Sequence, residues 1–457
     1  MNVIAATVQK IQGNDFYSAL KSRKSSIEKR FLAETEGSAA LFERASHVFP
    51  GGYTRDAVMR GPYPTFIAEG RGATLTDVDG RTRTDFWFNA TSLPLGHAHP
   101  VVMEAASVQL RKGTAYYAPT EHEIALAEML MERVPSADHI RFANSGSEAV
   151  MMGVRFARAF CRRSLIVKFE GSYHGSYDDV SWSVSPRLDQ VGAHNAPLPV
   201  PETSGLAGTD ERVTVLPFND AGVLRAYVEQ HHDRIAALLV EPMANRIGLL
   251  LPQREFLEEA RALCDRYGIV LIFDEVISFR VGYHGVQGLM GITPDVTTLG
   301  KIIGGGFAVG AVAGRADIMA LSSPDLAPRV THAGTFNGNP MMAVAGRATM
   351  AALTPAVFTN LAELGQYARD GLARITTGMP LQVTGEGSLF KVSATERKLH
   401  DYRDAAISDK TWEALASLAL LNEGFLLTTT MSGCVSTVTT RAQVDALLGA
   451  FRGVVAA

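Results

Sequence analysis

Two apolar runs mark the middle of the chain. Ala236–Val240 and Ile269–Phe273 are continuous apolar stretches, as in strands that are buried on both faces of a parallel sheet. A helix is predicted between them at Arg254–Tyr267, and short strands are predicted earlier at His139–Ala143 and Leu165–Phe169. Strands that alternate with helices are typical of α/β proteins, so we expect a parallel sheet in this part of the chain.

The pattern differs at the two ends of the chain. Residues 1–45 are predicted to be helical, and Thr65–Phe86 is predicted to form short antiparallel strands around a turn at Asp79-Gly80. A long helix is predicted after Asn339-Pro340, followed by helices and strands in an α+β arrangement. We therefore predict three regions: an N-terminal segment with a small subdomain at 1–100, a large α/β domain at 101–340 and a C-terminal α+β domain at 341–457. The C-terminal elements are expected at Met341–Leu353 (helix), Leu381–Ala394 (strands), Thr411–Asn422 (helix), Cys434–Thr439 (strand) and Ala442–Val455 (helix).

The composition excludes several classes of function. The 457 residues are too many for one small core, and a hydrophobic fraction of 46% is that of an ordinary globular protein. A net charge of −4 gives no basic field for nucleic acid, and no window approaches the ~18 apolar residues of a membrane span. The three cysteines are far apart, which favours neither a disulfide framework nor a metal site. We expect a cytoplasmic protein without nucleic-acid, membrane or metal partners.

Lys301 lies in the stretch Asp295–Gly306, separated by two residues from three consecutive glycines. Glycines let a ligand approach the main chain closely. A lysine in such a place is either an ordinary exposed cation or a desolvated amine, and desolvated amines serve as nucleophiles that form Schiff bases.

Two acids follow the two most apolar strands. Asp274 comes directly after Phe273, and Glu241 comes directly after Val240. Ligands of open α/β sheets bind outside the carboxyl ends of the strands, so these acids are expected at one edge of the sheet. A pyridine cofactor needs such an aspartate to keep its ring nitrogen protonated.

Three further motifs each allow two interpretations. Asn144–Ala149, with Ser145, Gly146 and Ser147 in its centre, is either a capped helix start or an anion site for phosphate. Gly171–Gly175 offers the flat ring of Tyr173 to a planar ligand, while His174 in the same motif could equally be structural. Gly334–Pro340 is either a second phosphate contact or a plain loop before a helix.

Together and in this order, these motifs resemble those of the class III pyridoxal-phosphate aminotransferases, from about Gly51 to the C-terminus. The likeness is densest from Asp274-Glu-Val through Asp295–Gly306 to Gly334–Pro340. It implies fold type I of the enzymes that use pyridoxal 5′-phosphate (PLP). That fold has a large α/β domain with a central, mostly parallel sheet and a small α+β domain built from N- and C-terminal parts.

The resemblance also implies roles by position. Lys301 matches the Schiff-base lysine, which also moves the substrate proton, and Asp274 matches the partner of the pyridine nitrogen. A homodimer with shared active sites is implied by Thr335, which matches a threonine that reaches the phosphate in the neighbouring subunit. The other implied cofactor contacts are Ser145, Gly146 and Ser147 for the phosphate, Tyr173 and Val276 for the two ring faces, and His174, Glu241 and Asn245 beside the ring.

Within the class, the chain is similar to the branch of glutamate-1-semialdehyde aminomutases and β-amino-acid (β-phenylalanine) aminotransferases. Arg55, in the stretch Pro50–Arg55, matches an arginine that binds a substrate carboxylate in the β-amino-acid enzymes, although a surface ion pair is the alternative. Thr84–Gly96 lacks the Ser-Trp-Gly-Pro stretch of the aminomutases, and Gly424–Gly433 lacks the arginine of the β-phenylalanine enzymes.

Two shorter departures also concern the site. The residues after Asp-Glu-Val are one fewer than in the aminomutases, and Glu241 is followed by Pro-Met-Ala-Asn-Arg, so that Asn245 or Arg246 must take over the contact to the cofactor hydroxyl. We expect a transaminase that moves an amino group from an amine donor, most simply a β-amino acid, to a 2-oxo acid. The alternative is an intramolecular aminomutase of the glutamate-1-semialdehyde type.

Overall fold

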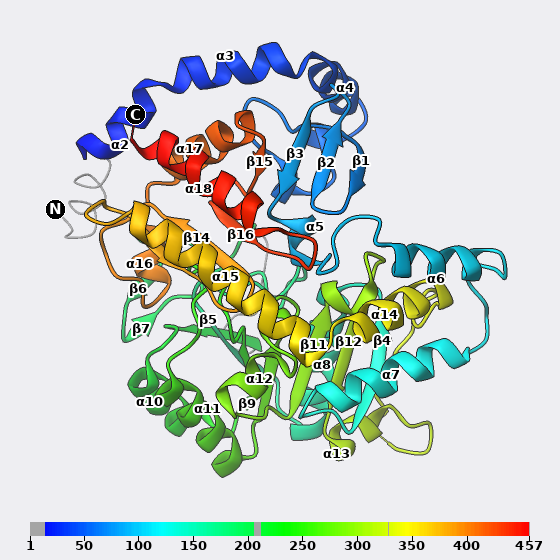
Figure 1. The fold of residues 1–457 in the computed structure, drawn as a ribbon. Coiled ribbons are helices and arrows are strands. Elements are labelled where there is room, and N and C mark those ends of the chain that lie inside the picture. The colour runs from blue at the N-terminus through cyan, green and yellow to red at the C-terminus, as the bar shows by residue number, and fades with distance from the viewer. Residues whose placement is uncertain (1–13, 205–211, 328, 457) are drawn as a thin grey trace. The chain divides into compact units, whose positions relative to one another are not determined.

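A computed structural model of the chain describes residues 14–204, 212–327 and 329–456 (Figure 1). The chain divides into two compact units. The central unit comprises residues 100–360 and 399–406, and the terminal unit comprises residues 14–99, 361–398 and 407–456. Both ends of the chain therefore contribute to one unit.

The central unit is built on a seven-stranded sheet with the order β4-β12-β11-β10-β9-β5-β8. Every neighbouring pair from β11 to β8 is parallel, while β12 runs antiparallel to both β11 and β4. The expected α/β class with a mostly parallel central sheet is thus confirmed. The strands are β4 (His139–Ala143), β5 (Leu165–Phe169), β8 (Val213–Leu216), β9 (Ile235–Val240), β10 (Val270–Asp274), β11 (Val296–Gly300) and β12 (Gly310–Gly314).

Helices cover this sheet (Figure 1). Helix α8 (Gly146–Cys161) packs along β9 to β12, and its buried face joins Val150, Phe156 and Ala157 to the apolar residues of the strands. Helix α11 (Arg254–Tyr267) packs on β9 and β10 beside α10 (Ala221–His231). The two apolar runs, β9 and β10, are buried at every residue because helices α8 and α11 pack on them.

Helix α14 (Pro340–Ala352) belongs to the central unit, whereas the sequence places a break at residue 340. It packs against α6 (Pro100–Leu110), α7 (Glu121–Arg133) and the 3₁₀ helix η4 (Lys301–Gly304), and this packing moves the division between the units to residue 360. Helix α15 (Pro355–Ile375) spans that division. No single helix in the described ranges is long and apolar enough to cross a membrane; α14 and α15, bent by 75°, meet that test only as a pair, by length and composition.

The terminal unit contains two small sheets with the orders β1-β2-β3-β15 and β13-β14-β16. The parallel pair of β3 and β15 joins a strand near the N-terminus to one near the C-terminus. The strands are β1 (Ile67–Arg71), β2 (Thr74–Asp77), β3 (Thr82–Asp85), β13 (Gln382–Thr384), β14 (Leu389–Ser393), β15 (Phe425–Leu426) and β16 (Ser432–Cys434). The helices are α2 (Asp15–Ser22), α3 (Lys24–Glu34), α4 (Glu36–Ser46), α17 (Lys410–Asn422) and α18 (Arg441–Val455).

The predicted strand at Cys434–Thr439 is wrong beyond its first residue, because β16 ends at Cys434. The next residues bond locally instead. The amide of Ser436 donates to Oγ1 of Thr439 at 3.0 Å, and Thr440 caps α18. Serine and threonine side chains that bond nearby backbone compete with strand pairing in this way.

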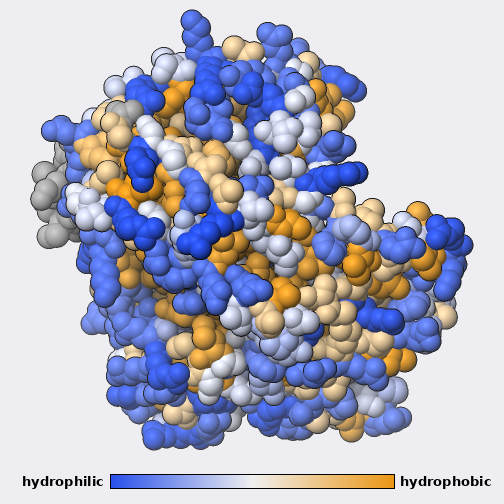
Figure 2. Space-filling model, viewed as in Figure 1, coloured by the Kyte–Doolittle hydropathy of each residue, from blue (hydrophilic) through white to orange (hydrophobic). Residues whose placement is uncertain are grey.

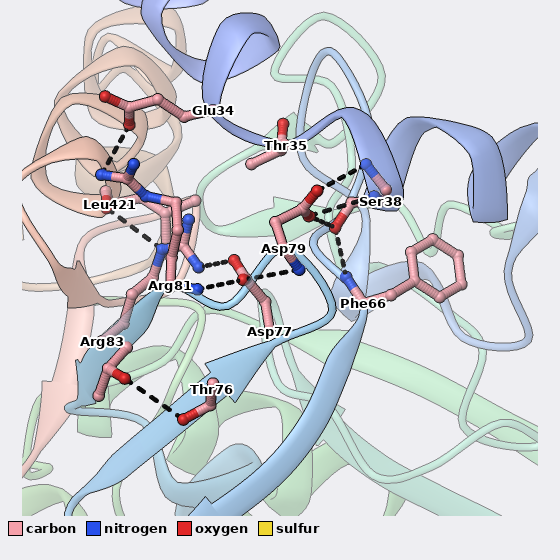
Figure 3. Close-up of polar contacts among 12 residues, drawn as sticks. Glu34, Thr35, Ser38, Phe66, Thr76, Asp77, Asp79, Arg81, Arg83 and Leu421 are labelled. Atoms are coloured by element: carbon pink, nitrogen blue, oxygen red, sulfur yellow. Dashed lines mark hydrogen bonds and ion pairs between the residues drawn. The ribbon is translucent and has the colours of Figure 1, made fainter.

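A polar network ties the first helices of the terminal unit to its sheet (Figure 3). Asp79, in the turn between β2 and β3, accepts from the amide of Ser38 at 3.1 Å and from its hydroxyl at 2.6 Å. Asp77 forms a buried ion pair with Arg83, whose Nε also donates to the carbonyl oxygen of Leu421 in α17 at 3.4 Å. A buried arginine is stable only when it is paired, so this contact fixes β3 against α17.

Candidate functional site

Lys301 is the first residue of η4 and directly follows β11. Its φ of +50° lies in the left-handed region, which a lysine enters only at a cost of about 1–3 kcal/mol when its surroundings hold it there. Burial lowers the pKa of its amine, while the nearby Asp274 and Glu241 act in the opposite direction. The chain thus holds a partly desolvated amine at the end of a central strand, which is the reactive form considered for this lysine from its sequence.

Asp274, the last residue of β10, is held by three donors. Its Oδ1 accepts from the amide of Val276 at 3.1 Å and from the hydroxyl of Thr298 at 3.2 Å, and its Oδ2 lies 2.8 Å from Nδ1 of His174. Thr298 reaches it because β10 and β11 pair in parallel with Asp274 opposite Thr298. Hydrogen bonds of this kind stabilise the ionised carboxylate.

His174 is 1% exposed, and burial lowers the pKa of its imidazole below its ordinary value. The ring is therefore neutral, and its Nδ1–H donates to Asp274 because a carboxylate can only accept. Nε2 is then left with a lone pair that meets no hydrogen-bond partner among the described residues. A buried acceptor without a partner is uncommon and marks a place where a ligand or water donates.

Glu241 follows β9 and is 4% exposed. It accepts from the amides of Tyr173 and Asn245, each at 3.1 Å. Burial, together with the charge of Asp274, raises the pKa of Glu241 to about 8. Burial thus favours the protonated form of Glu241.

The N-terminus of α8 forms another wall of the site. Ser145 is the N-cap, and its hydroxyl accepts from the amide of Glu148 at 3.2 Å. The hydroxyl of Ser147 accepts from the amide of Ser176 at 3.2 Å. Gly310 packs so closely here that a Cβ on it would lie 2.0 Å from the carbonyl oxygen of Ser145. The capped-helix interpretation of this motif is confirmed, and the phosphate site stays a prediction, with the positive end of the helix at the cavity wall.

These groups surround one cavity of about 170 Å³. Eight of the predicted residues line it. They come from segments at β5, α8, β9, β10 and β11. The lining residues are Gly146, Ser147, Tyr173, His174, Gly175, Glu241, Asp274, Val276, Ile277, Lys301 and Val309.

Four predicted residues do not line the cavity. Ser145 contributes as the cap, Asn245 contacts Glu241 through its backbone, and Thr335 is exposed on the loop before α14. Arg55 lies in the terminal unit, where its guanidinium donates to Oδ1 of Asn89 at 3.2 Å. The roles assigned to these four residues stay predictions.

Thr298 is a residue of the site that sequence reasoning missed. Its signal was present, since a threonine inside a strand as buried as β11 needs a polar partner. The pairing register that supplies Asp274 as that partner becomes visible only in the folded sheet.

Residues 56–455 match the sequence pattern that defines the family Aminotransferase class-III. The chain belongs to this family. Class III aminotransferases are enzymes that depend on PLP, so the cofactor and enzyme class expected from the resemblance are confirmed.

Similar proteins cover most of the chain. A glutamate-1-semialdehyde 2,1-aminomutase of Methanothermobacter thermautotrophicus is 43% identical over 81% of this chain and 87% of its own. The crystal structure of an omega-transaminase from Sphaerobacter thermophilus is 46% identical, with a TM-score of 0.87 over 92% of this chain and 97% of its own. A β-phenylalanine aminotransferase from Variovorax paradoxus is 34% identical, with a TM-score of 0.86 over 95% of this chain and 97% of its own.

The cavity of this class III aminotransferase fits PLP in its chemistry. Asp274 offers carboxylate oxygens that can accept from a pyridinium N–H, and Tyr173 and Val276 offer flat and branched apolar surfaces for a ring. Gly146 and Gly175 allow close packing beside the helix end: a Cβ at Gly146 would lie 3.0 Å from the side chain of Val276, and a Cβ at Gly175 would lie 2.3 Å from the Ser147 hydroxyl. An amine, an acid and an anion-binding helix end thus lie around one space.

Proposed function

We propose that the protein is a PLP-dependent transaminase that moves an amino group from an amino-bearing carboxylate, most simply a β-amino acid, to a 2-oxo acid. The observation that carries the proposal is the amine of Lys301 in the same cavity as Asp274, with its pKa lowered by burial. PLP, when bound, supplies an aldehyde that captures amines and a ring that accepts electrons from the substrate carbon.

Each group of the cavity has a distinct task in this proposal. Asp274 holds the proton on the ring nitrogen, and His174 orients and stabilises its carboxylate. Gly146 and Ser147 bind the phosphate at the helix end, and Tyr173 packs on the ring. Lys301 anchors the cofactor and moves a proton at the substrate carbon, for which a partly neutral amine is required.

We further propose a homodimer in which Thr335 reaches the active site of the neighbouring subunit. Apolar side chains are exposed on the central unit, and Figure 2 shows apolar residues at the surface over α6 and α14. Exposed apolar surface of this kind marks a protein interface. The exposed side chains include Val101, Met103 and Leu110 on α6, Ile124 on α7, and Phe307 and Phe336 on loops.

Arg55 is proposed to bind the substrate carboxylate. Its guanidinium makes one hydrogen bond, to Asn89, and forms no ion pair with an acid in the described ranges. That favours the carboxylate clamp over the surface ion pair, because its remaining N–H groups can bind a carboxylate in two-point fashion.

An intramolecular aminomutase is the second candidate. The curated relatives, 37–43% identical, carry the name glutamate-1-semialdehyde aminomutase, which supports this candidate more strongly than the first. The missing Ser-Trp-Gly-Pro stretch in Thr84–Gly96, and the greater identity to the omega-transaminase, support the transaminase.

One assay separates the two candidates. The purified holoenzyme is offered glutamate 1-semialdehyde alone, and separately a β-amino acid with pyruvate or 2-oxoglutarate. A transaminase makes product only when donor and acceptor are both present. Turnover of the semialdehyde without an oxo acid would refute the transaminase and establish the aminomutase.

A second experiment tests the cofactor assignment independently of substrate. Borohydride reduction of the holoenzyme and peptide mapping should place a pyridoxyl group on Lys301. A pyridoxyl group on any other lysine would overturn the assignment of this residue.

A further inference from the structure

Lys168 is a buried lysine with no task in the proposed chemistry. It lies on β5, its exposure is 0%, and it forms no ion pair with a carboxylate among the described residues. An unpaired buried ammonium is costly, so its retention needs a compensating set of hydrogen bonds.

Three backbone carbonyls provide those hydrogen bonds. The amine donates to the carbonyl oxygens of Ser172 at 3.1 Å, of Val180 at 2.9 Å and of Trp182. An ammonium has three N–H groups and no acceptor, so its donors match these three acceptors one to one. The geometry thus suits the charged form of the lysine.

The three carbonyls belong to the segment 172–182, which carries Tyr173 and His174. This segment forms no helix or strand longer than a bridge, and its backbone is held mainly by turns such as the bond from the Val180 amide to the Tyr177 carbonyl at 3.1 Å. Through these hydrogen bonds, Lys168 links the first residue of the segment, Ser172, to its last residues, Val180 and Trp182. A segment without regular pairing depends on such links for a fixed position.

We propose that Lys168 is a positioning residue for the cofactor site, a three-point link that holds the segment 172–182 so that Tyr173 and His174 face the cavity. This inference rests on the proposed function, in which both residues serve PLP. Through the segment, Lys168 keeps the Nδ1 of His174 at its 2.8 Å contact with Asp274.

The link depends on the charge of the lysine. A neutral amine has two N–H groups and would leave one of the three carbonyls without a donor. Burial lowers the pKa of Lys168 to about 7, Glu202 and Glu241 raise it, and Arg246 lowers it further. The carbonyls also favour the ammonium, and we expect the link to weaken as the pH rises above neutrality.

The test compares three variants with the wild type: Lys168→Met, which removes all donors; Lys168→Gln, which keeps an amide with two N–H groups; and Lys391→Met. Lys391 is a matched control, since it is another buried lysine, 3% exposed, on β14 of the terminal unit. The PLP affinity of each apoprotein is measured by absorbance titration from pH 6.5 to 9. Hydrogen exchange of the amides of segment 172–182 is measured on the same apoproteins.

We expect Lys168→Met to bind PLP at least about tenfold more weakly at pH 6.5, with faster exchange confined to the segment. The PLP affinity and the exchange rate of Lys168→Gln should lie between those of the wild type and of Lys168→Met. Lys391→Met should be less stable but keep its PLP affinity. The difference in PLP affinity between the wild type and Lys168→Met should become smaller as the pH rises.

Unchanged PLP affinity and unchanged exchange in Lys168→Met would overturn the inference. The exchange measurement needs no cofactor. If Lys168→Met is unstable, Lys168→Gln is compared with the wild type in its place. Failure of the wild type to bind PLP would instead contradict the proposed function, which keeps the two failures distinct.

Discussion

Replacing Glu241 by Gln should change how the stability of the protein depends on pH. Glutamine resembles the protonated carboxyl in charge and shape but cannot ionise. In the wild type, burial raises the pKa of Glu241 to about 8 from an ordinary value of 4.5, so the folded chain holds a proton that the unfolded chain releases. The stability that this proton supports is fully present below about pH 4.5 and is lost as the pH rises towards 8.

The size of the effect follows from the same two values. The interval from 4.5 to about 8, at about 1.4 kcal/mol per pH unit, corresponds to at most about 5 kcal/mol for a fully buried group. The variant also places an NH₂ group against one of the two amides, of Tyr173 or Asn245, that donate to Glu241. That loss costs about 1–3 kcal/mol at every pH and does not alter the slope.

Urea unfolding of the apoproteins from pH 5 to 8.5 measures both effects. The variant should be the less stable protein at pH 5, and the difference should close and reverse as the pH approaches 8. Titration of other groups contributes equally to both proteins and cancels in the difference. A difference that stays constant from pH 5 to 8 would show that Glu241 is ionised throughout, and the reasoning would fail.

Three further substitutions test other parts of the structure. Lys301→Ala should abolish amino transfer and the covalent pyridoxyl adduct after borohydride reduction, measured by mass spectrometry, whereas the exposed Lys398→Ala should leave both intact. Gly310→Ala should lower the free energy of unfolding by about 1–3 kcal/mol and weaken PLP binding, because its Cβ would press on the carbonyl of Ser145. Gly449→Ala in α18 is the control: the space around Gly449 is open, so urea unfolding should show no loss of stability. Leu110→Asp on exposed α6 should shift the dimer towards monomer in light scattering, whereas Val48→Asp in the terminal unit should not; equal masses for all three proteins would contradict the proposed interface.

The elements with strong patterns were predictable from the sequence. The bounds of α11 agree with the prediction at both ends, and β9 and β10 agree within one residue, because long apolar runs and a well-marked helix leave few alternatives. Strand β12 could not be predicted: Gly-Ala-Val-Ala-Gly has little side-chain signal, and small residues suit it because Ser145 and Asp295 approach its two terminal glycines closely.

The site was predictable as a set of residues but not as a geometry. Lys301 and Glu241 follow strands and Asp274 ends one, and the rule that strand ends meet at one edge was enough to group them. What the sequence could not provide is the raised pKa of Glu241, which depends on burial, or the hydrogen bonds of Asp274 to His174 and Thr298. The division of the chain at residue 360 likewise depends on the packing of α14, which no local pattern encodes.

The contact between Arg83 and Leu421 has a consequence for how the protein is made. These residues are 338 positions apart, and the strand that carries Arg83 completes its sheet only when β15 is available. At about 5–20 residues per second, a ribosome needs roughly 20–70 s to deliver the missing segment after Arg83 has been synthesised. During that time the nascent chain carries an unpaired edge of β3, and Arg83 has Asp77 as a partner but lacks the carbonyl of Leu421, while the central unit is already emerging. The first hundred residues are therefore the part of the chain for which a chaperone that shields unfinished sheet edges matters most.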